Sequence, residues 1–379
     1  MEIPRSENQY IEFKSERVSA KVLAEEIVAF ANAEGGEIWL GVEDDRQITG
    51  ISRSYEEDVM NICRNGVIPP LQPVYQEMVI EDAKIACIAV PKGVDRPYYT
   101  SKNKYYIRVG STKRIASRAE LIRLFQASGL FHYDLVEVNG ATVSQLDFSA
   151  ISDYFSRYQI SFANETEDEK IRLLTASDIL GDNRRPTVGG NLVFGINPEK
   201  TLPQAGVTFA HFSGTKLDAE LIDKKFFGGS LPRQVDNALA AIKANRSVAS
   251  TIQGVKRVEK PHYPDTVFRE LLVNAAVHRN YSIIGSQIRI FMFNDRIEFI
   301  SPGRLPNTVS IEKLAVGTSF ARNPLLVRLM EKLGYMDRLG RGLPMVCQEA
   351  IKLGKDVTFD DSGEEFRVTL QWPGDQNKC

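Results

Sequence analysis

The segment between Val18 and Asp45 constrains the fold of this chain most, because it joins a helix pattern directly to a strand pattern. Apolar residues recur at helical spacing through residues 18–34, and Gly35-Gly36 follows at once. Glycine adopts the left-handed backbone conformation without steric cost, so the pair predicts that the helix ends there and turns into a strand over 37–42. An acidic turn, Glu43-Asp44-Asp45, closes that strand.

The patterns that follow complete a mixed domain. Two strand-like runs, 73–80 and 84–91, flank the short polar segment Glu81-Asp82-Ala83 and predict a hairpin. A strand pattern over 104–109 and a helix pattern over 120–126 come next. We therefore expect one compact α+β domain at residues 1–130.

The rest of the chain predicts at least one more domain, because 379 residues exceed one ordinary core. Residues 131–255 suggest a mixed α/β connecting region, with a strand at 134–138 and an amphipathic helix at 231–246. Its chemistry is not apparent, and self-association into a homo-oligomer is expected there. Residues 256–373 form the third segment, with helix patterns at 266–281, 323–335 and 343–354, a hairpin at 287–301 and a last strand at 365–372.

Composition decides only the broad class of the protein. Hydrophobic residues make up 43% and charged residues 25%, as in globular proteins. The chain has no apolar run long enough to span a membrane, and its first residues are charged where a signal peptide is apolar, so we expect a cytoplasmic protein. Its 4 cysteines and 4 histidines lack the spacing of a zinc site, so free thiols are expected.

A net charge of −2 hides a local basic run. Between Lys84 and Arg123 there are ten lysines and arginines against two acidic residues, Asp95 and Glu120. Such an excess predicts contact with phosphate groups. The alternative is a solvated basic face that binds nothing.

The N-terminal motifs resemble the Schlafen AlbA-type DNA-binding domain over about residues 1–130. The resemblance is carried by Glu7, Glu12-Phe13-Lys14, the run AFANAEGGEIWLGVEDD, Ile48-Thr49-Gly50-Ile51 and YYIRVGSTKRIAS. It implies binding of DNA or RNA, with phosphates meeting Lys104, Arg108, Lys113 and Arg114 and with Tyr105 and Tyr106 available for base stacking.

The same resemblance leaves nucleic-acid cleavage open as an alternative. Schlafen-type RNases use a carboxylate cluster, a role that falls here on Glu7, Glu12 and one of Asp44 or Asp45. In that case Glu7, Glu12 and Asp45 would hold Mg²⁺ or Mn²⁺, which stabilises the departing phosphate oxygen. A third possibility is that the two glutamates only cap a helix or form ion pairs with nearby basic side chains.

The C-terminal motifs resemble the GHKL ATPases, which have a Bergerat-like α/β sandwich. FRELLVNAAVHR resembles their N box, in which Glu270 would orient the attacking water and Asn274 would bind the Mg²⁺ of ATP. Gly303 lies where the adenine-pocket loop belongs. Gly340 and Gly342 resemble the second glycine box, at a helix N-terminus that can face phosphate.

One departure from the GHKL pattern affects nucleotide binding. Ser301 stands where those proteins have the aspartate that reads the adenine amino group; a serine supplies no charge and reaches less far. ATP binding and a scaffold without nucleotide both stay open.

The leading interpretation is a nucleic-acid-binding transcriptional regulator. A Mg²⁺- or Mn²⁺-dependent nuclease is the second, and a GHKL ATPase with a protein-docking N-terminal domain is the third. A P-loop helicase is not expected, because the chain has no GxxxxGK[ST] motif. Many proteins of the resembled family end in a winged helix that reads DNA, and we expect no such domain after residue 373. Binding to the sugar-phosphate backbone is therefore expected rather than reading of a DNA sequence.

Overall fold

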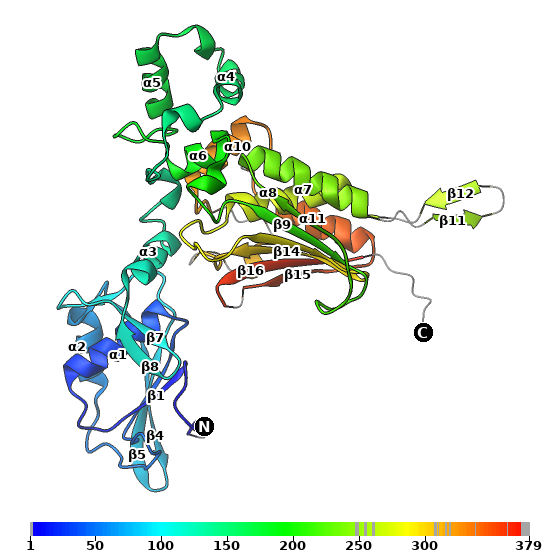
Figure 1. Cartoon of the computed structure of the whole chain (residues 1–379). Coiled ribbons are helices and arrows are strands. Elements are labelled where there is room, and N and C mark those ends of the chain that lie inside the picture. Colours follow the sequence, from blue (N-terminus) through cyan, green and yellow to red (C-terminus); the bar gives the residue numbers. More distant parts are fainter. Residues whose placement is uncertain are drawn as a thin grey trace. The chain divides into compact units, whose positions relative to one another are not determined.

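The computed structural model describes residues 3–246, 250–253, 256–259, 262–306, 309, 311–314, 317, 320–337, 339–361 and 363–372, and only the backbone of 250–259. Cys379 lies outside these residues. They form two compact units, Met1–Phe131 and His132–Cys379 (Figure 1). Each unit contains both helices and sheets, so the expected α+β class is confirmed. Among the described residues, no helix is both long and apolar enough to cross a membrane.

The first unit is built on a four-stranded sheet with the strand order β1-β2-β5-β4. The strands are β1 (Ile11–Lys14), β2 (Gly36–Leu40), β4 (Val74–Ile80) and β5 (Ala83–Val90). β1 is parallel to β2, and the other pairs are antiparallel, which confirms the hairpin predicted at 73–91.

The turn between α1 (Ala20–Asn32) and β2 needs its glycine, as predicted. Gly35 has φ +80°, and a Cβ there would lie 2.7 Å from the carbonyl oxygen of Val90. α1 begins at Ser19, whose hydroxyl accepts a hydrogen bond from the backbone N–H of Val22. Its buried face, which includes Ile27 and Phe30, packs in the core of the unit.

The remaining elements of the first unit surround α1. They are α2 (Glu56–Asn65), the pair β3 (Val67–Ile68) and β6 (Tyr99–Thr100), the hairpin β7 (Tyr106–Val109) and β8 (Thr112–Ile115), and α3 (Arg118–Ala127). A capping box between Ser117 and Glu120 starts α3. β7 and β8 form a separate hairpin that packs against α1.

The second unit is built on a six-stranded sheet with the order β10-β9-β13-β14-β16-β15. The strands are β9 (Val207–Phe212), β10 (Leu221–Phe227), β13 (Ile288–Met292), β14 (Arg296–Pro302), β15 (Val357–Asp360) and β16 (Glu365–Gln371). β9 is parallel to β13, whereas all other pairs are antiparallel. One sheet thus runs across the boundary predicted at 255/256.

Helices α7, α8 and α11 lie along one face of this sheet (Figure 1). The helices of the unit are α4 (Phe148–Ser156), α5 (Glu167–Ala176), α6 (Val188–Phe194), α7 (Leu231–Asn245), α8 (Asp265–Val277), α9 (Ile311–Leu314), α10 (Pro324–Lys332) and α11 (Gly342–Lys352). Phe268 and Leu271 of α8 share one core with Phe209 and Phe299 of the sheet. The short strands β11 (Ser250–Gln253) and β12 (Lys256–Glu259) pair separately.

The strand predicted at 134–138 is wrong. Residues Tyr133–Leu135 form a 3-10 turn instead. The Oδ2 atom of Asp134 accepts hydrogen bonds from the backbone N–H groups of Leu325, at 2.7 Å, and Leu326, at 3.1 Å. A buried aspartate therefore caps the first turn of α10, a long-range contact that no local pattern reveals.

Two candidate functional sites

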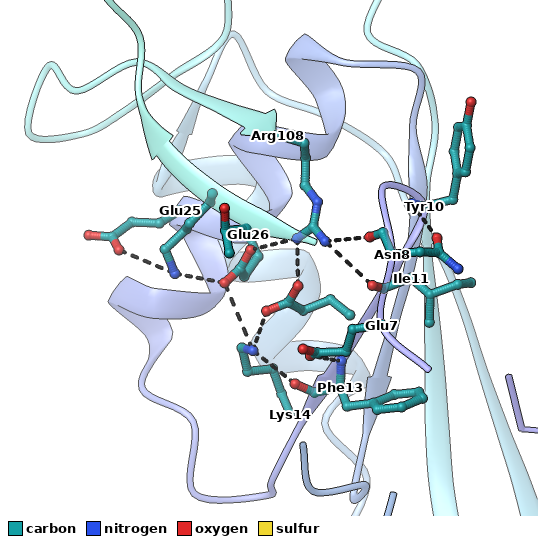
Figure 2. A network of polar contacts seen from close by, with 12 residues as sticks. Glu7, Asn8, Tyr10, Ile11, Phe13, Lys14, Glu25, Glu26 and Arg108 are labelled. Atoms are coloured by element: carbon teal, nitrogen blue, oxygen red, sulfur yellow. Dashed lines mark hydrogen bonds and ion pairs between the residues drawn. The ribbon is translucent and has the colours of Figure 1, made fainter. Parts of the chain in front are cut away.

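A network of ionised side chains joins β1, α1, β7 and β8 in the first unit (Figure 2). The Arg108 side chain is fully buried, with Nη1 2.5 Å from an oxygen of Glu12 and 3.3 Å from one of Glu26. Its Nη2 donates to the carbonyl oxygen of Asn8 at 2.7 Å, and its guanidinium stacks 4.4 Å from the ring centre of Phe30. Arg108 of β7 thus links β1 and α1 in the interior of the unit, and its side chain is not accessible to a phosphate.

The partners of Arg108 are linked to two lysines (Figure 2). Glu12 also accepts a hydrogen bond from Lys14, and Glu26 accepts one from Lys113 at 2.7 Å. Burial favours a raised pKa for Glu12, but Lys14 and Arg108 outweigh it and lower that pKa. Burial raises the pKa of Glu26 despite its bond to Lys113.

The carboxylates proposed as a metal centre do not fit Mg²⁺ or Mn²⁺ in this arrangement. Glu12 is engaged by two cations, and an oxygen of Glu7 accepts the backbone N–H of Phe13 at 2.9 Å. Asp45 accepts the backbone N–H of Gln47 in an exposed turn. Within the described ranges, no group of three or more His, Cys, Asp and Glu residues is placed to hold a metal ion.

The other predicted nucleic-acid residues lie on or beside the β7–β8 hairpin and differ in exposure. Lys104 is exposed in the loop before β7, and Arg114 is exposed on β8 with a 2.5 Å ion pair to Glu120. Tyr106 is buried and donates its hydroxyl proton to Glu25 at 2.9 Å. Tyr105 is half-buried, and its ring centre lies 5.1 Å from that of Tyr99.

A groove of about 660 Å³ between α1 and α2 was not predicted. Its apolar lining includes Leu23 and Val59, and exposed Lys21, Lys102 and Lys104 lie among its lining residues. The charge excess around Lys102 and Lys104 was the available signal. The groove itself could not be expected, because α2 was not recognised as a helix.

In the second unit, all five predicted nucleotide-site residues line one cavity. This cavity of about 140 Å³ is also lined by Ser301, and the five residues are Glu270, Asn274, Gly303, Gly340 and Gly342. They come from α8, the end of β14 and the start of α11, so the structure brings together motifs that are up to 72 positions apart, from 270 to 342.

Glu270 and Asn274 are in contact at the cavity wall. The amide nitrogen of Asn274 donates to Glu270 Oε1 at 2.6 Å and to the Glu270 carbonyl oxygen at 2.9 Å. Burial raises the pKa of Glu270. A Cβ at position 342 would lie 1.6 Å from Glu270 Oε1, so α11 can approach the carboxylate this closely only with glycine at its first residue.

Two further side chains give the cavity a polar wall. Ser301 is buried, and its hydroxyl donates to the carbonyl oxygen of Ala275 at 2.8 Å, which leaves its oxygen lone pairs as acceptors. Arg322, which was not predicted, is buried and donates to the carbonyl oxygens of His278, at 2.8 Å, and Arg304. Burial lowers the pKa of Arg322 to about 10, so it is still a cation at neutral pH.

The polar groups at this cavity are of the kinds that bind a nucleotide with Mg²⁺, but the cavity is smaller than ligand pockets usually are. Asn274 uses its amide nitrogen as donor, so its amide oxygen can face a cation. Ligand pockets typically measure roughly 300–1,000 Å³. The 140 Å³ seen here is smaller.

Two family models match the chain. Residues 7–117 match the one described as "Schlafen, AlbA_2", and residues 285–370 match the one described as "Putative ATP-dependent DNA helicase recG C-terminal". A Schlafen AlbA_2 domain and a recG C-terminal domain are therefore present, which confirms the expected AlbA-type domain and the two-domain layout. The second match begins after α8, so Glu270 and Asn274 lie outside it.

One solved structure shares the fold over most of the chain. The chain is 21% identical to the DIP2311 protein from Corynebacterium diphtheriae, with a TM-score of 0.50, over 96% of this chain and 75% of that one. It is 24% identical to the N-terminal domain of a RecG-related protein from Nitrosomonas europaea, over 28% of this chain and 81% of that one, with a TM-score of 0.23. None of the curated proteins matches the chain.

Proposed function

We propose that this chain binds nucleic acid through its first unit and a purine nucleotide through its second, as a nucleotide-responsive transcriptional regulator. The Schlafen AlbA_2 match over 7–117 carries the first half of the proposal. The groove between α1 and α2 supports it, because Lys102 and Lys104 are exposed there beside an apolar lining. Glu16, Glu25 and Asp58 line the groove too, and Lys21 pairs with Glu25 at 4.0 Å. Lysines attract the phosphates of a nucleic acid irrespective of its sequence.

The groove predicts which residues meet the nucleic acid. Each lost phosphate contact reduces the salt slope of binding by about 0.9 on duplex DNA and by about 0.7 on a single strand. The double variant Lys102→Ala/Lys104→Ala should therefore bind labelled single-stranded RNA, single-stranded DNA or duplex DNA more weakly, with a slope flatter by about 1.8 on the duplex and about 1.4 on single strands. Lys216→Ala/Lys352→Ala, which removes two exposed lysines of the second unit, is the matched control.

The same assay tests the nuclease alternative when Mn²⁺ is added. We expect the wild type to bind without cutting, because the oxygens of Glu12 serve Lys14 and Arg108. Cleavage that requires Mn²⁺ and is lost in Glu12→Gln would show that the first unit is a nuclease and not only a binding domain. Equal salt slopes in the lysine variant and its control would reject the groove.

The convergence of Glu270, Asn274, Gly303, Gly340 and Gly342 on one cavity supports the second half of the proposal. There Asn274 would hold the Mg²⁺ ion, which neutralises phosphate charge when bound. Glu270 lies beside it with a raised pKa and would take a proton from water if the nucleotide is hydrolysed. Ser301 would accept a hydrogen bond from the base, since its own proton is already donated to Ala275.

Calorimetry with ATP, ADP and GTP tests this pocket. We expect modest affinity for ATP, and Asn274→Ala should lose the Mg²⁺-dependent part of it while Glu270→Gln keeps binding. Because the serine acceptor carries no charge, discrimination between ATP and GTP should be poor. Absence of binding heat with every nucleotide would show that the second unit is a scaffold.

A further inference from the structure

β10 (Leu221–Phe227) ends the six-stranded sheet of the second unit, so its outer edge has no neighbouring strand in the described part of the chain. Its large apolar side chains are uncovered: Leu221, Ile222 and Phe226 are 46%, 56% and 54% exposed. An edge strand presents unpaired N–H and C=O groups, and apolar side chains beside them make it a template for another strand.

We propose that β10 pairs antiparallel with β10 of a second copy of this chain, which joins two six-stranded sheets into one. This inference is independent of the functions proposed above and names where the chain self-associates. The charge pattern of the strand, LIDKKFF, selects a second copy as the partner. Its one acidic residue, Asp223, and the basic Lys225 stand on either side of Lys224.

The pairing has one favoured register. When the two strands are centred on Lys224, each Asp223 lies opposite Lys225 of the second copy. Each Phe226 then lies near the bulge at Ile222 of the second copy, where the alternation of side chains is interrupted. Opposite residues share a face of the sheet with their Cβ atoms about 4.5–5.5 Å apart, close enough for ion pairs and apolar contacts. The two Asp223–Lys225 pairs oppose a single repulsion between the two Lys224 side chains.

Other registers are disfavoured by charge. The smallest slide that keeps the same faces together is two residues, because side chains alternate between faces. In one direction that slide puts Asp223 opposite Asp223, and in the other it puts Lys225 opposite Lys225. Like charges directly opposite each other are destabilising.

The two faces of β10 are prepared for this contact. Asp223 and Lys225 lie opposite His211 and Phe209 of β9 and form an ion pair with each other at 2.5 Å, which the pairs with a second copy would share. Asp223 also accepts a hydrogen bond from Asn245 of α7 at 2.8 Å. These charges are therefore held in place before a second copy arrives, which lowers the entropy lost on pairing.

The other face offers apolar surface beside the edge. Lys224 and Phe226 pair with Ala210 and Thr208 of β9, next to a groove of about 720 Å³. The lining of that groove includes Phe212, Leu217, Leu221 and Phe291, of which Leu217 is 62% exposed. Ile222 and Phe226 of the second copy would extend this apolar surface across the joint.

The competing explanation is a protected edge. Lysines and bulges are devices by which edge strands avoid pairing, and β10 has both, with a bulge between Leu221 and Asp223. A protected edge would leave the chain monomeric and Ile222 and Phe226 in water.

Cysteine trapping separates the two explanations. With Cys347 and Cys379 replaced by serine, Lys224→Cys should form a disulfide-linked dimer under mild oxidation, since this residue lies on the twofold axis. Thr358→Cys is the matched control, because it is exposed on β15, the edge strand at the other end of the sheet. Equal cross-linking at both positions, or none at Lys224→Cys, would overturn the proposal.

Sedimentation equilibrium gives the second measurement. The wild type should dimerise, and Phe226→Glu should weaken dimerisation by about tenfold or more, since it puts a charge in place of an apolar side chain at the joint. Asp223→Lys alone should also weaken it, whereas Asp223→Lys/Lys225→Asp should restore it. A wild type that is monomeric at its highest soluble concentration, or a charge swap that restores nothing, would reject this register.

Discussion

At the scale of single residues, the first unit depends on buried charges that lie far apart in the sequence. The partners of Arg108, Glu12 and Glu26, lie 96 and 82 positions away. Arg108 was predicted as a phosphate contact from the local excess of basic residues. Such a local count carries no information about acidic partners that lie far away in the sequence. By contrast, Gly342 was predicted beside a phosphate-binding helix start, and the structure gives it a steric reason, the contact with Glu270.

Replacing Arg108 should therefore affect folding before binding. Arg108→Met leaves Glu12 and Glu26 buried with fewer counter-ions, and breaking a buried pair costs about 3–5 kcal/mol. Arg114→Met removes the exposed pair with Glu120 and should cost at most about 1 kcal/mol. Urea unfolding of both variants measures the difference, and equal losses would show that the Arg108 network is not stabilising.

At the scale of elements, local patterns predicted the helices and hairpins whose periodicity is strong, such as α1, α8 and β13–β14. They did not predict that β9 and β10 join the C-terminal strands, since the parallel pair of β9 and β13 links residues some 80 positions apart, such as Val207 and Ile288. Nor did they reveal the cap on α10. Long-range hydrogen bonds decide these features, and periodicity carries no trace of them.

The cap on α10 predicts a pH dependence of stability. Burial raises the pKa of Asp134 to about 6, above its ordinary value of about 3.9. The folded chain thus binds the proton of the Asp134 carboxyl more tightly than the unfolded chain does. The stabilisation of the folded state by this proton is therefore complete below about pH 4 and is lost as the pH rises through 6. Its upper bound is about 3 kcal/mol, because a tenfold difference in proton affinity between the folded and unfolded chains is worth about 1.4 kcal/mol.

Asp134→Asn isolates this contribution. The amide oxygen can still accept from Leu325 and Leu326 but does not titrate between pH 4 and 6. Urea unfolding at several pH values should show a fall in wild-type stability across this range that is smaller in the variant. Parallel curves for the two proteins would contradict the assignment.

At the scale of the whole molecule, the two units have separate cores. The buried clusters of the first unit lie between Ile3 and Tyr106, and the main cluster of the second lies between Val138 and Leu370. A unit with its own core can fold alone. Residues 1–131 should therefore unfold cooperatively by themselves and should keep the salt slope of the full chain on short oligonucleotides.

On long nucleic acids the fragment and the full chain should differ. If β10 joins two copies, the resulting dimer carries two first units. Once one of them is bound to a nucleic acid, binding of the other becomes intramolecular. The full chain should then bind a long nucleic acid more tightly than the fragment does. Phe226→Glu should reduce the affinity of the full chain for the long strand to that of the fragment, without changing binding to short oligonucleotides. Fluorescence anisotropy with one short and one long labelled strand measures both. A fragment that binds the long strand as tightly as the full chain would show that pairing of β10 adds nothing to nucleic-acid binding.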